Sequence, residues 1–291
     1  VYSHYEDNLT DIIETLRSKG MQVLVSSVPV NLRHSAPFLS VRRADLSPEQ
    51  LDQWREMTRR GAASADAENW NNAVTLFQSA LEIDPGYADT HFRLATAYEN
   101  LGKYQEAKTH YERALDLDAL RFRADARINN IIQEVTSDLE SNRVDFVDSV
   151  AFFERASEPF QPGWNLLLEH VHYGFAGNHL LAGEIARSIV AKMNGPADYE
   201  PLPGVEIARR VGFPNHDTIA EIENLQGMIE HPPFPGQSNY ADLAAFLSNT
   251  LERVTRASGS SSDVIERRKD VVNSGLADWK IYFELAVLNQ R

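Results

Sequence analysis

The chain repeats itself with a period of 34 residues between Trp54 and Ala119. Residues of the same character recur at this spacing: Trp70 and Tyr104, Ala73 and Ala107, Phe77 and Tyr111, Ala80 and Ala114, Leu81 and Leu115, Asp84 and Asp118. A fixed period of this length predicts stacked helical hairpins. Small residues such as Ala73 and Ala107 let the two helices of a hairpin approach closely, so we expect both to be buried between paired helices.

Two further features support helical hairpins. Gly61 and Ala95 occupy the matching small position in the first helix of each unit, and Pro85 ends one hairpin because Pro cannot continue a helix. Over about two units the pattern resembles the tetratricopeptide repeat (TPR). This resemblance implies that the first helices line a concave groove that binds a peptide or protein partner. The groove candidates are Arg55, Thr58, Ala62, Phe92, Thr96, Glu99 and Asn100.

Two hairpins form only a shallow groove, because repeat arrays normally need three or more units. The repeats are therefore also candidates for a lid or docking arm of a neighbouring domain. His91 and His110 lie within the predicted hairpin helices, as groove or packing residues. The segment Asp118–Asp125 leads into a further helix, whose apolar stripe of Ile128, Ile131, Ile132 and Val135 predicts a cap on the second repeat.

A small α/β part flanks the repeats. Residues 8–19 have helical periodicity, and Gln22–Val28 and Arg143–Val147 have the β-branched composition of buried strands. An all-helical connection between two strands predicts that they are parallel neighbours in one sheet. Parallel sheets usually contain more than two strands. Together with the absence of Met at position 1, this predicts a fragment whose remaining strands precede Val1.

The loop after the first predicted strand, Pro29–Phe38, is long and polar. Ligands bind at the carboxyl ends of strands in open α/β sheets, so this loop is a candidate ligand-binding segment. A plain surface loop is the alternative. Arg121 and Arg123 are candidate contacts for an anionic group, because Arg forms bidentate pairs with carboxylates and phosphates. The alternative that we favour for both is a solvated face at a helix start.

An acid and a histidine lie three residues apart, just before an amphipathic helix predicted over 175–193. In hydrolases, a carboxylate that accepts a hydrogen bond from one imidazole nitrogen fixes the tautomer and leaves the other nitrogen free to take a proton from a serine. Glu169 and His172 have these roles available as catalytic residues. A structural loop pair is the alternative. Nearby His170 and His179 lack the helical spacing of zinc ligands, so we predict no metal.

The order of several fragments resembles an SGNH/GDSL-type hydrolase with TPR hairpins inserted in it and appended after it. The fragments are Asn31-Leu32-Arg33 with Pro37-Phe38, Asp118–Asp125, Glu169–His172 with Gly177-Asn178, Pro232-Pro233-Phe234 with Gly236-Gln237, and Asp278-Trp279. The family usually has Asp where this chain has Glu169. Its Gly-Asp-Ser block is absent from the 291 residues, so we expect this chain alone to lack serine-dependent esterase activity.

The remaining segments are predicted from periodicity and from Pro, Gly and Ser content. Helices are expected over 205–211, 218–229 and 240–257, linkers over 194–204 and 258–263, and the start of another TPR-like helix over 278–286. The resulting division is 1–47 (partial SGNH-like segment), 48–140 (TPR hairpins and capping helix), 141–195 (SGNH-like segment with the acid-x-x-His loop), 196–257 (helical extension) and 258–291 (linker and TPR-like helix). The predicted fold class is mostly α with a small α/β part.

Composition excludes several kinds of function. The net charge is −14, from 28 basic and 42 acidic residues, which disfavours nucleic acid and anionic membranes as partners. The absence of cysteine removes disulfides, thiolate nucleophiles and cysteine-based metal sites. No segment is apolar enough for a membrane span, and we predict no cofactor. The cellular compartment stays open.

Two functional classes follow. The first is part of an ester hydrolase that acts on a small ester substrate, with His172 as general base and Glu169 as its orienting acid. The second is a non-catalytic TPR module that binds a peptide or protein partner. A serine on a tight strand-to-helix turn, in sequence preceding Val1, would distinguish the first from the second.

Overall fold

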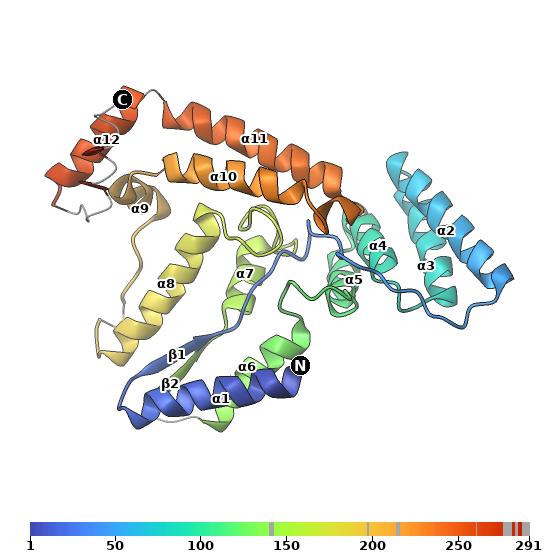
Figure 1. Cartoon of the computed structure of the whole chain (residues 1–291), viewed down its shortest axis with the longest axis horizontal. Coiled ribbons are helices and arrows are strands. Elements are labelled where there is room, and N and C mark those ends of the chain that lie inside the picture. The colour runs from blue at the N-terminus through green and yellow to red at the C-terminus, as the bar shows by residue number, and fades with distance from the viewer. Residues whose placement is uncertain are drawn as a thin grey trace. The chain divides into compact units, whose positions relative to one another are not determined.

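The computed structural model describes residues 1–139, 143–196, 198–213, 216–259, 261–275, 281–282 and 285–286. Within this part of the chain the protein is mostly helical, with twelve α-helices and one two-stranded parallel sheet (Figure 1). The predicted fold class is therefore confirmed. Two compact units are present: residues 1–185 with 236–239, and residues 186–235 with 240–291.

The TPR segment forms two helical hairpins, as the 34-residue period predicts. The first pairs α2 (Pro48–Asp66) with α3 (Trp70–Ile83), and the second pairs α4 (Ala88–Asn100) with α5 (Tyr104–Asp116). Ser47 and Gln50 form a capping box at the start of α2, and Pro48 stands at its first position. Ala73 and Ala107 are almost fully buried, which confirms that the small residues lie where the paired helices meet.

The sheet brings together two segments that are far apart in the sequence. β1 (Val23–Ser26) and β2 (Val144–Val147) are parallel neighbours, with Val23 opposite Val144 and Ser26 opposite Val147. This confirms the pairing predicted from buried-strand composition and a helical crossover. The helix α1 (Tyr2–Ser18), which starts earlier than its periodicity predicts, packs beside the sheet through Ile13.

The helix α6 (Ala126–Asp138) has a different partner from the one predicted. Its stripe residues Ile131 and Val135 share a core with Ile13, Val23 and Val144, so α6 mainly covers the sheet together with α1. It contacts α5 less extensively. The prediction of a cap on the second repeat is therefore wrong in its main contact, because an apolar stripe does not specify which neighbour buries it.

The helix α8 (Phe175–Lys192) also differs from its predicted packing. Leu180 and Leu181 lie against Phe153 of α7 (Ser149–Ser157) and against Leu166 and Leu167 of the following loop. The buried residues of α8 are glycines, and its large apolar residues are half-buried or exposed. Leu180 and Leu181 of the apolar stripe thus pack on α7 and this loop, where packing on the sheet was predicted, and Ile189 is exposed.

The segment that follows β1 is buried rather than a surface loop. Within residues 29–40, here called the anchor segment, Val30, Leu32 and Ala36 belong to the same core as residues of α3, α4 and α5. Its backbone is held by the side chains of Asp118 and Arg123, in the connection between α5 and α6, and by the backbone carbonyl oxygens of Pro162 and His170. Buried backbone groups need such partners. The alternative of a plain surface loop is therefore wrong.

The second unit is helical in its described part. It contains α9 (Gly204–Val211), α10 (His216–Ile229), α11 (Tyr240–Ser258) and α12 (Ser261–Asn273). The short 3-10 turn Phe234–Gly236 ends at the first residue of the 236–239 segment, which belongs to the first unit. α10 packs on α11 through buried Leu and Ile side chains. The Ser-rich break predicted at 258–263 is short, because α12 begins at Ser261. The predicted TPR-like helix at 278–286 lies mostly outside the described residues.

Gly61 gives a test of the close helix contact in the first hairpin. A Cβ atom built on Gly61 would lie 2.6 Å from the ring of Phe77 on α3, whose side chain is fully buried. Ala is better than Gly in a helix by about 1 kcal/mol. Overpacking of a tight core costs about 1–3 kcal/mol. We therefore expect Gly61→Ala to lower the free energy of unfolding by up to about 2 kcal/mol in urea denaturation.

The matched control is Gly227→Ala in α10. Nothing lies within 4 Å of a Cβ atom at Gly227, which is exposed in the interior of its helix. Only the helix-propensity gain applies there, so this variant should be more stable by up to about 1 kcal/mol. A gain in stability for Gly61→Ala as well would contradict the close approach of α2 and α3.

Candidate functional site

The acid–histidine loop (residues 160–174) connects α7 to α8 and folds back on itself. Leu167 and Tyr173 form an antiparallel bridge, and the Leu168 amide donates to the carbonyl oxygen of His172 at 2.8 Å. Gly177, in the first turn of α8, fits against this loop because a Cβ atom there would lie 2.3 Å from the Leu166 carbonyl oxygen. A glycine at the start of α8 therefore lets the helix close onto the loop that holds the acid and the histidine.

Glu169 and His172 are hydrogen-bonded to each other. The Nδ1 atom of His172 lies 2.6 Å from Glu169 Oε1, as the acid-x-x-His spacing predicts. The same carboxylate oxygen accepts backbone N–H groups from Val171 at 3.1 Å and His172 at 2.5 Å. The Glu169 side chain is fully buried, whereas 51% of the His172 side chain is exposed. A buried acid thus orients a solvent-accessible imidazole, and an Nδ1–H donor leaves Nε2 as an acceptor.

His170 lies on the other side of the same carboxylate. Its Nδ1 contacts Glu169 Oε2, and its ring stands edge-on to Phe38 with centroids 5.1 Å apart. Burial, together with the charges of Arg123 and His172, lowers the pKa of His170 to about 3. His170 is therefore neutral at physiological pH and mostly enclosed. Of the two histidines beside Glu169, His172 is the one that solvent reaches.

Asn31 ties the anchor segment to the acid–histidine loop. It is fully buried, and all its polar groups are bonded. Its side-chain amide donates to the Glu169 carbonyl oxygen at 2.8 Å, and its backbone amide donates to the His170 carbonyl oxygen at 3.0 Å. Its Oδ1 accepts the His34 amide at 2.8 Å. Asn31 therefore fixes the backbone on which Glu169 and His170 stand.

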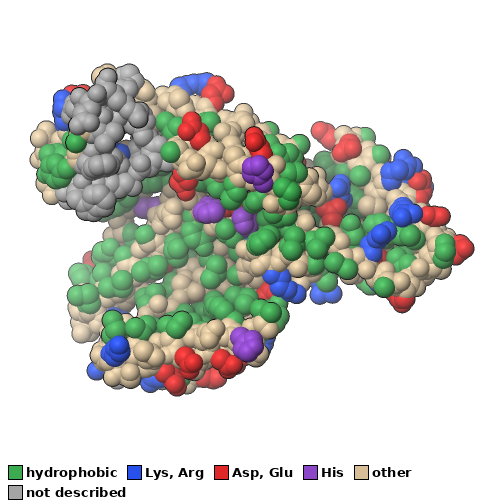
Figure 2. All heavy atoms as spheres, in the orientation of Figure 1, with side chains coloured by type: hydrophobic (Ala, Val, Ile, Leu, Met, Phe, Trp, Pro, Cys, Tyr) green, Lys and Arg blue, Asp and Glu red, His purple; other side chains and the backbone are tan. Residues whose placement is uncertain are grey.

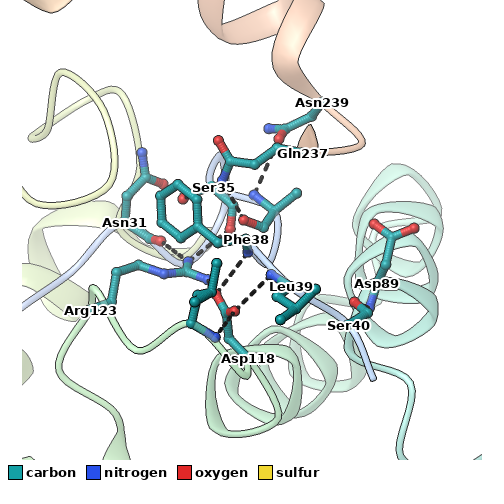
Figure 3. A network of polar contacts seen from close by, with 12 residues as sticks. Asn31, Ser35, Phe38, Leu39, Ser40, Asp89, Asp118, Arg123, Gln237 and Asn239 are labelled. Atoms are coloured by element: carbon teal, nitrogen blue, oxygen red, sulfur yellow. Dashed lines mark hydrogen bonds and ion pairs between the residues drawn. The ribbon is translucent and has the colours of Figure 1, made fainter. Parts of the chain in front are cut away.

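A buried ion pair between Arg123 and Asp118 also holds the anchor segment (Figure 3). Arg123 donates to the carbonyl oxygens of Asn31 at 2.9 Å and Ser35 at 2.8 Å, and lies 3.2 Å from Asp118. Asp118 accepts the backbone amides of Phe38 and Leu39 at 2.9 and 3.0 Å. Burial lowers the pKa of Arg123, and the carboxylate of Asp118 opposes that shift. The pair therefore joins the connection between α5 and α6 to the anchor segment.

The two arginines predicted at this helix start therefore have different environments. Arg123 is buried among protein acceptors, so it lies neither on a solvated face nor in contact with solvent-borne anions. Arg121 is half-exposed; it contacts Asp125 and lies over the ring of Tyr2 at 5.5 Å. Sequence reasoning missed the partner of Arg123, because Asp118 was assigned to the end of a repeat.

The turn before α11 also contributes to the network. Gln237 donates to the Ala36 carbonyl oxygen at 2.5 Å, and Asn239 both donates to the His34 carbonyl oxygen and accepts the Ala36 amide. Residues 236–239 belong to the first compact unit. Most of the short fragments that carried the hydrolase resemblance, around residues 31–38, 118–125, 169–172 and 237, thus meet at one place in the structure.

The predicted peptide groove is partly covered by the chain itself. On α4, Phe92 is buried against Tyr111, and the Thr96 hydroxyl is bonded to the Phe92 carbonyl oxygen. Glu99 pairs with Arg33 of the anchor segment at 2.7 Å. The prediction of Phe92 as an open groove residue is wrong, because the anchor segment packs in the core that contains it. Arg55 and Asn100 are exposed, and Thr58 and Ala62 are half-buried.

His91 and His110 are packing residues that bond to each other. Their Nδ1 atoms lie 2.9 Å apart, and His91 Nε2 lies 3.0 Å from the Pro85 carbonyl oxygen. This chain of bonds requires a neutral His91 that is protonated on Nε2, with His110 donating from Nδ1 to His91 Nδ1. Burial lowers the pKa of His110 to about 4 and also lowers that of His91.

These histidines make stability depend on pH. Burial also lowers the pKa of His34 to about 3; its Nδ1 accepts the Trp164 amide at 3.2 Å. Each such ring is neutral when folded and protonates near pH 6.5 when unfolded. Between pH 6.5 and about 4 the unfolded state binds more protons, so the free energy of unfolding is fully present above pH 6.5 and falls as the pH falls. The slope is up to about 1.4 kcal/mol per pH unit for each buried ring, and less for half-buried His110.

Urea denaturation at pH 7.5, 6.5, 5.5 and 4.5 measures this slope. His34→Asn keeps an acceptor near the position of Nδ1 but cannot be protonated. It should therefore lower the slope by up to about 1.4 kcal/mol per pH unit, which corresponds to one proton. His4→Asn, at an exposed position of α1, is the matched control and should leave the slope unchanged. Equal slopes for wild type and His34→Asn would contradict a neutral, buried His34.

Other kinds of site have less support in the described part of the chain. No group of three His, Asp or Glu side chains there is arranged to hold a metal ion. None of the helices described is both long and apolar enough to cross a membrane. On the face drawn in Figure 2, acidic and basic side chains are interspersed over α2 and α3 instead of forming a stripe of one sign. Such a surface lacks the basic stripe that tracks phosphates.

Comparison with known proteins supports the repeats. The family model of the tetratricopeptide repeat matches residues 64–126, which include α3, α4 and α5. No curated protein matches the chain. The match agrees with the two hairpins and supports a protein-interaction module. Neither comparison identifies an SGNH/GDSL hydrolase component.

Proposed function

We propose that this chain is part of an SGNH/GDSL-type ester hydrolase in which the TPR hairpins bind a protein partner. The observation that carries the proposal is the 2.6 Å bond between His172 Nδ1 and buried Glu169, on a ring that is half-exposed. The Glu169 carboxylate is buried and the His172 ring is accessible, an arrangement that suits an orienting acid and a general base.

The chemistry assigned to each residue follows from this geometry. With Nδ1–H bonded to Glu169, His172 Nε2 accepts the proton of a serine hydroxyl as that oxygen attacks the ester carbonyl. The resulting imidazolium then donates the proton to the leaving alcohol, and Glu169 stabilises the positive charge. The longer arm of Glu compared with Asp is accommodated because its carboxylate folds back onto the backbone amides of Val171 and His172.

The serine is the part of this proposal that the 291 residues do not supply. No Gly-Asp-Ser block occurs in them, so we propose a nucleophile on a segment outside this sequence. The convergence of the fragments around Asn31, Asp118, Glu169 and Gln237 supports a site at this position. An imidazole without a serine to activate assists water only weakly, so this chain alone should hydrolyse esters very slowly.

The test compares p-nitrophenyl acetate hydrolysis by this chain and by the longest protein that its gene encodes. The long form should show hydrolysis that a serine-reactive phosphonate blocks and that falls by about 10³-fold or more in His172→Ala. His4→Ala, at an exposed position, is the control. Full activity of the long form with His172→Ala would remove the catalytic role. Phosphonate-sensitive hydrolysis by this chain alone would place the nucleophile inside it.

The second candidate function is a non-catalytic TPR interaction module, favoured by the family match over residues 64–126. Exposed Arg55 and Asn100 are the groove residues that the anchor segment leaves accessible. An inactive long form over a series of esters, with a partner whose binding is lost on Arg55→Ala and Asn100→Ala, would favour this function. Activity that depends on His172 favours the hydrolase.

A further inference from the structure

A cavity of about 340 Å³ lies in the first compact unit where β1 leads into the anchor segment. Its walls come from four places: residues 28–32, the last turns of α5, the start of α6, and α7 with Pro162. The apolar side chains among them are Val28, Val30, Leu32, Leu115, Val150 and Pro162. This volume falls within the range of small-molecule sites, and the place, at the carboxyl end of a parallel strand, is where α/β proteins bind ligands.

The polar part of the lining is acidic. Glu112, Asp116, Asp125 and Glu154 all border the cavity. The cations that face these groups are Lys108, 2.8 Å from Glu154 and 3.6 Å from Glu112, and Arg121, which contacts Asp125. Four carboxylates are therefore matched by two cations. An anionic ligand would meet net negative charge here.

Glu112 has the fewest protein partners of the four acids, and 46% of its side chain is exposed. Asp125 accepts the Ile128 amide, Asp116 accepts the Ala126 amide, and Glu154 is close to Lys108, whereas Glu112 has only the longer contact with Lys108. Burial raises the pKa of Glu112; Lys108 opposes this shift, and the charge of Glu154 adds to it. A second cation beside Glu112 would stabilise its charged carboxylate.

We propose that this cavity binds a small organic cation, with its apolar body against Val30, Leu32 and Leu115 and its ammonium group beside Glu112. Val30 and Leu32 flank Asn31, which points the other way and bonds to the acid–histidine loop. Neither Glu169 nor His172 lines the cavity, so the cation site is separate from the acid–histidine pair. The site rests on the cavity and its charges, and does not depend on the proposed hydrolase.

The experiment titrates the chain with phenethylamine, and with 2-phenylethanol and phenylacetate as neutral and anionic analogues, by ¹H–¹⁵N NMR. Phenethylamine should shift the amide signals of residues 28–32 and of the first turn of α7, with millimolar affinity. The alcohol should bind several-fold more weakly and phenylacetate weakest. Equal binding of all three, or shifts confined to other residues, would overturn the assignment.

Two variants locate the site. Glu112→Gln should weaken phenethylamine binding by about threefold to tenfold and leave 2-phenylethanol binding unchanged. Glu106→Gln, an exposed residue of the same helix outside the cavity, is the charge-matched control and should leave both unchanged. Val150→Phe should fill the cavity and abolish binding of both, with folding checked by circular dichroism. Equal affinities for wild type and Glu112→Gln would overturn the proposed place of the ammonium group.

Discussion

Replacing Asp118 by Ala is expected to lower the free energy of unfolding of the first compact unit by about 3–5 kcal/mol. The change leaves the Arg123 guanidinium buried without its counter-charge. It also removes the acceptor of the backbone amides of Phe38, Leu39 and Leu120. Urea denaturation followed by circular dichroism measures the loss.

The control for Asp118→Ala is an ion pair at the surface. The side chain of Asp52 is 77% exposed and lies 3.4 Å from Arg55, so Asp52→Ala should change stability by less than about 0.5 kcal/mol. The double variant Asp118→Ala with Arg123→Met removes the orphaned charge and should regain part of the loss. A loss of under about 1 kcal/mol for Asp118→Ala, or a double variant less stable than the single one, would contradict the buried pair.

Asn31→Ala is expected to cost about 2–5 kcal/mol. Two buried backbone groups, the Glu169 carbonyl oxygen and the His34 amide, lose their partner, and each unsatisfied buried group costs about 1–3 kcal/mol. Because the lost bond holds the backbone carbonyl group of Glu169, amide hydrogen exchange at Val171 and His172 should also accelerate. Urea denaturation and hydrogen exchange give the two readouts.

Asn129 provides a matched control for Asn31. Its side-chain amide also bonds twice to backbone, accepting the Val28 amide at 2.7 Å and donating to the Val28 carbonyl oxygen at 3.2 Å, but both bonds are exposed. Water replaces these bonds, so Asn129→Ala should cost about 1 kcal/mol or less. Similar losses for the two variants would show that burial does not distinguish them and would contradict the anchoring role of Asn31.

The local parts of the fold could be predicted from the sequence. The 34-residue period located both hairpins because it records contacts between neighbouring helices, as burial of Ala73 and Ala107 confirms. The parallel pairing of β1 with β2 followed from buried-strand composition and the rule for crossover connections. The bond between Glu169 and His172 was predictable because the two residues lie three positions apart in one loop.

The non-local partners could not be predicted. The apolar stripes of α6 and α8 show that one face of each helix is buried, but not which neighbour buries it. Arg33 and Glu99 are 66 positions apart, and nothing in either local sequence indicates that the anchor segment enters the side of α4 expected to bind peptides. The anchoring roles of Asn31 and Arg123 could not be predicted, because Asn31 bonds to Glu169, 138 positions away, and Arg123 bonds to Asn31, 92 positions away.

The parallel pairing of β1 with β2 has a consequence for the order in which the protein is made. Val23 pairs with Val144, so the first strand leaves the ribosome 121 residues before its partner. At about 5–20 residues per second, this interval lasts roughly 6–24 s. The hairpins α2–α3 and α4–α5 depend on local contacts, which form in microseconds to milliseconds, and so fold within it. The nascent chain therefore carries an unpaired, aggregation-prone strand beside finished repeats, a period in which a chaperone that binds extended apolar segments has access to it.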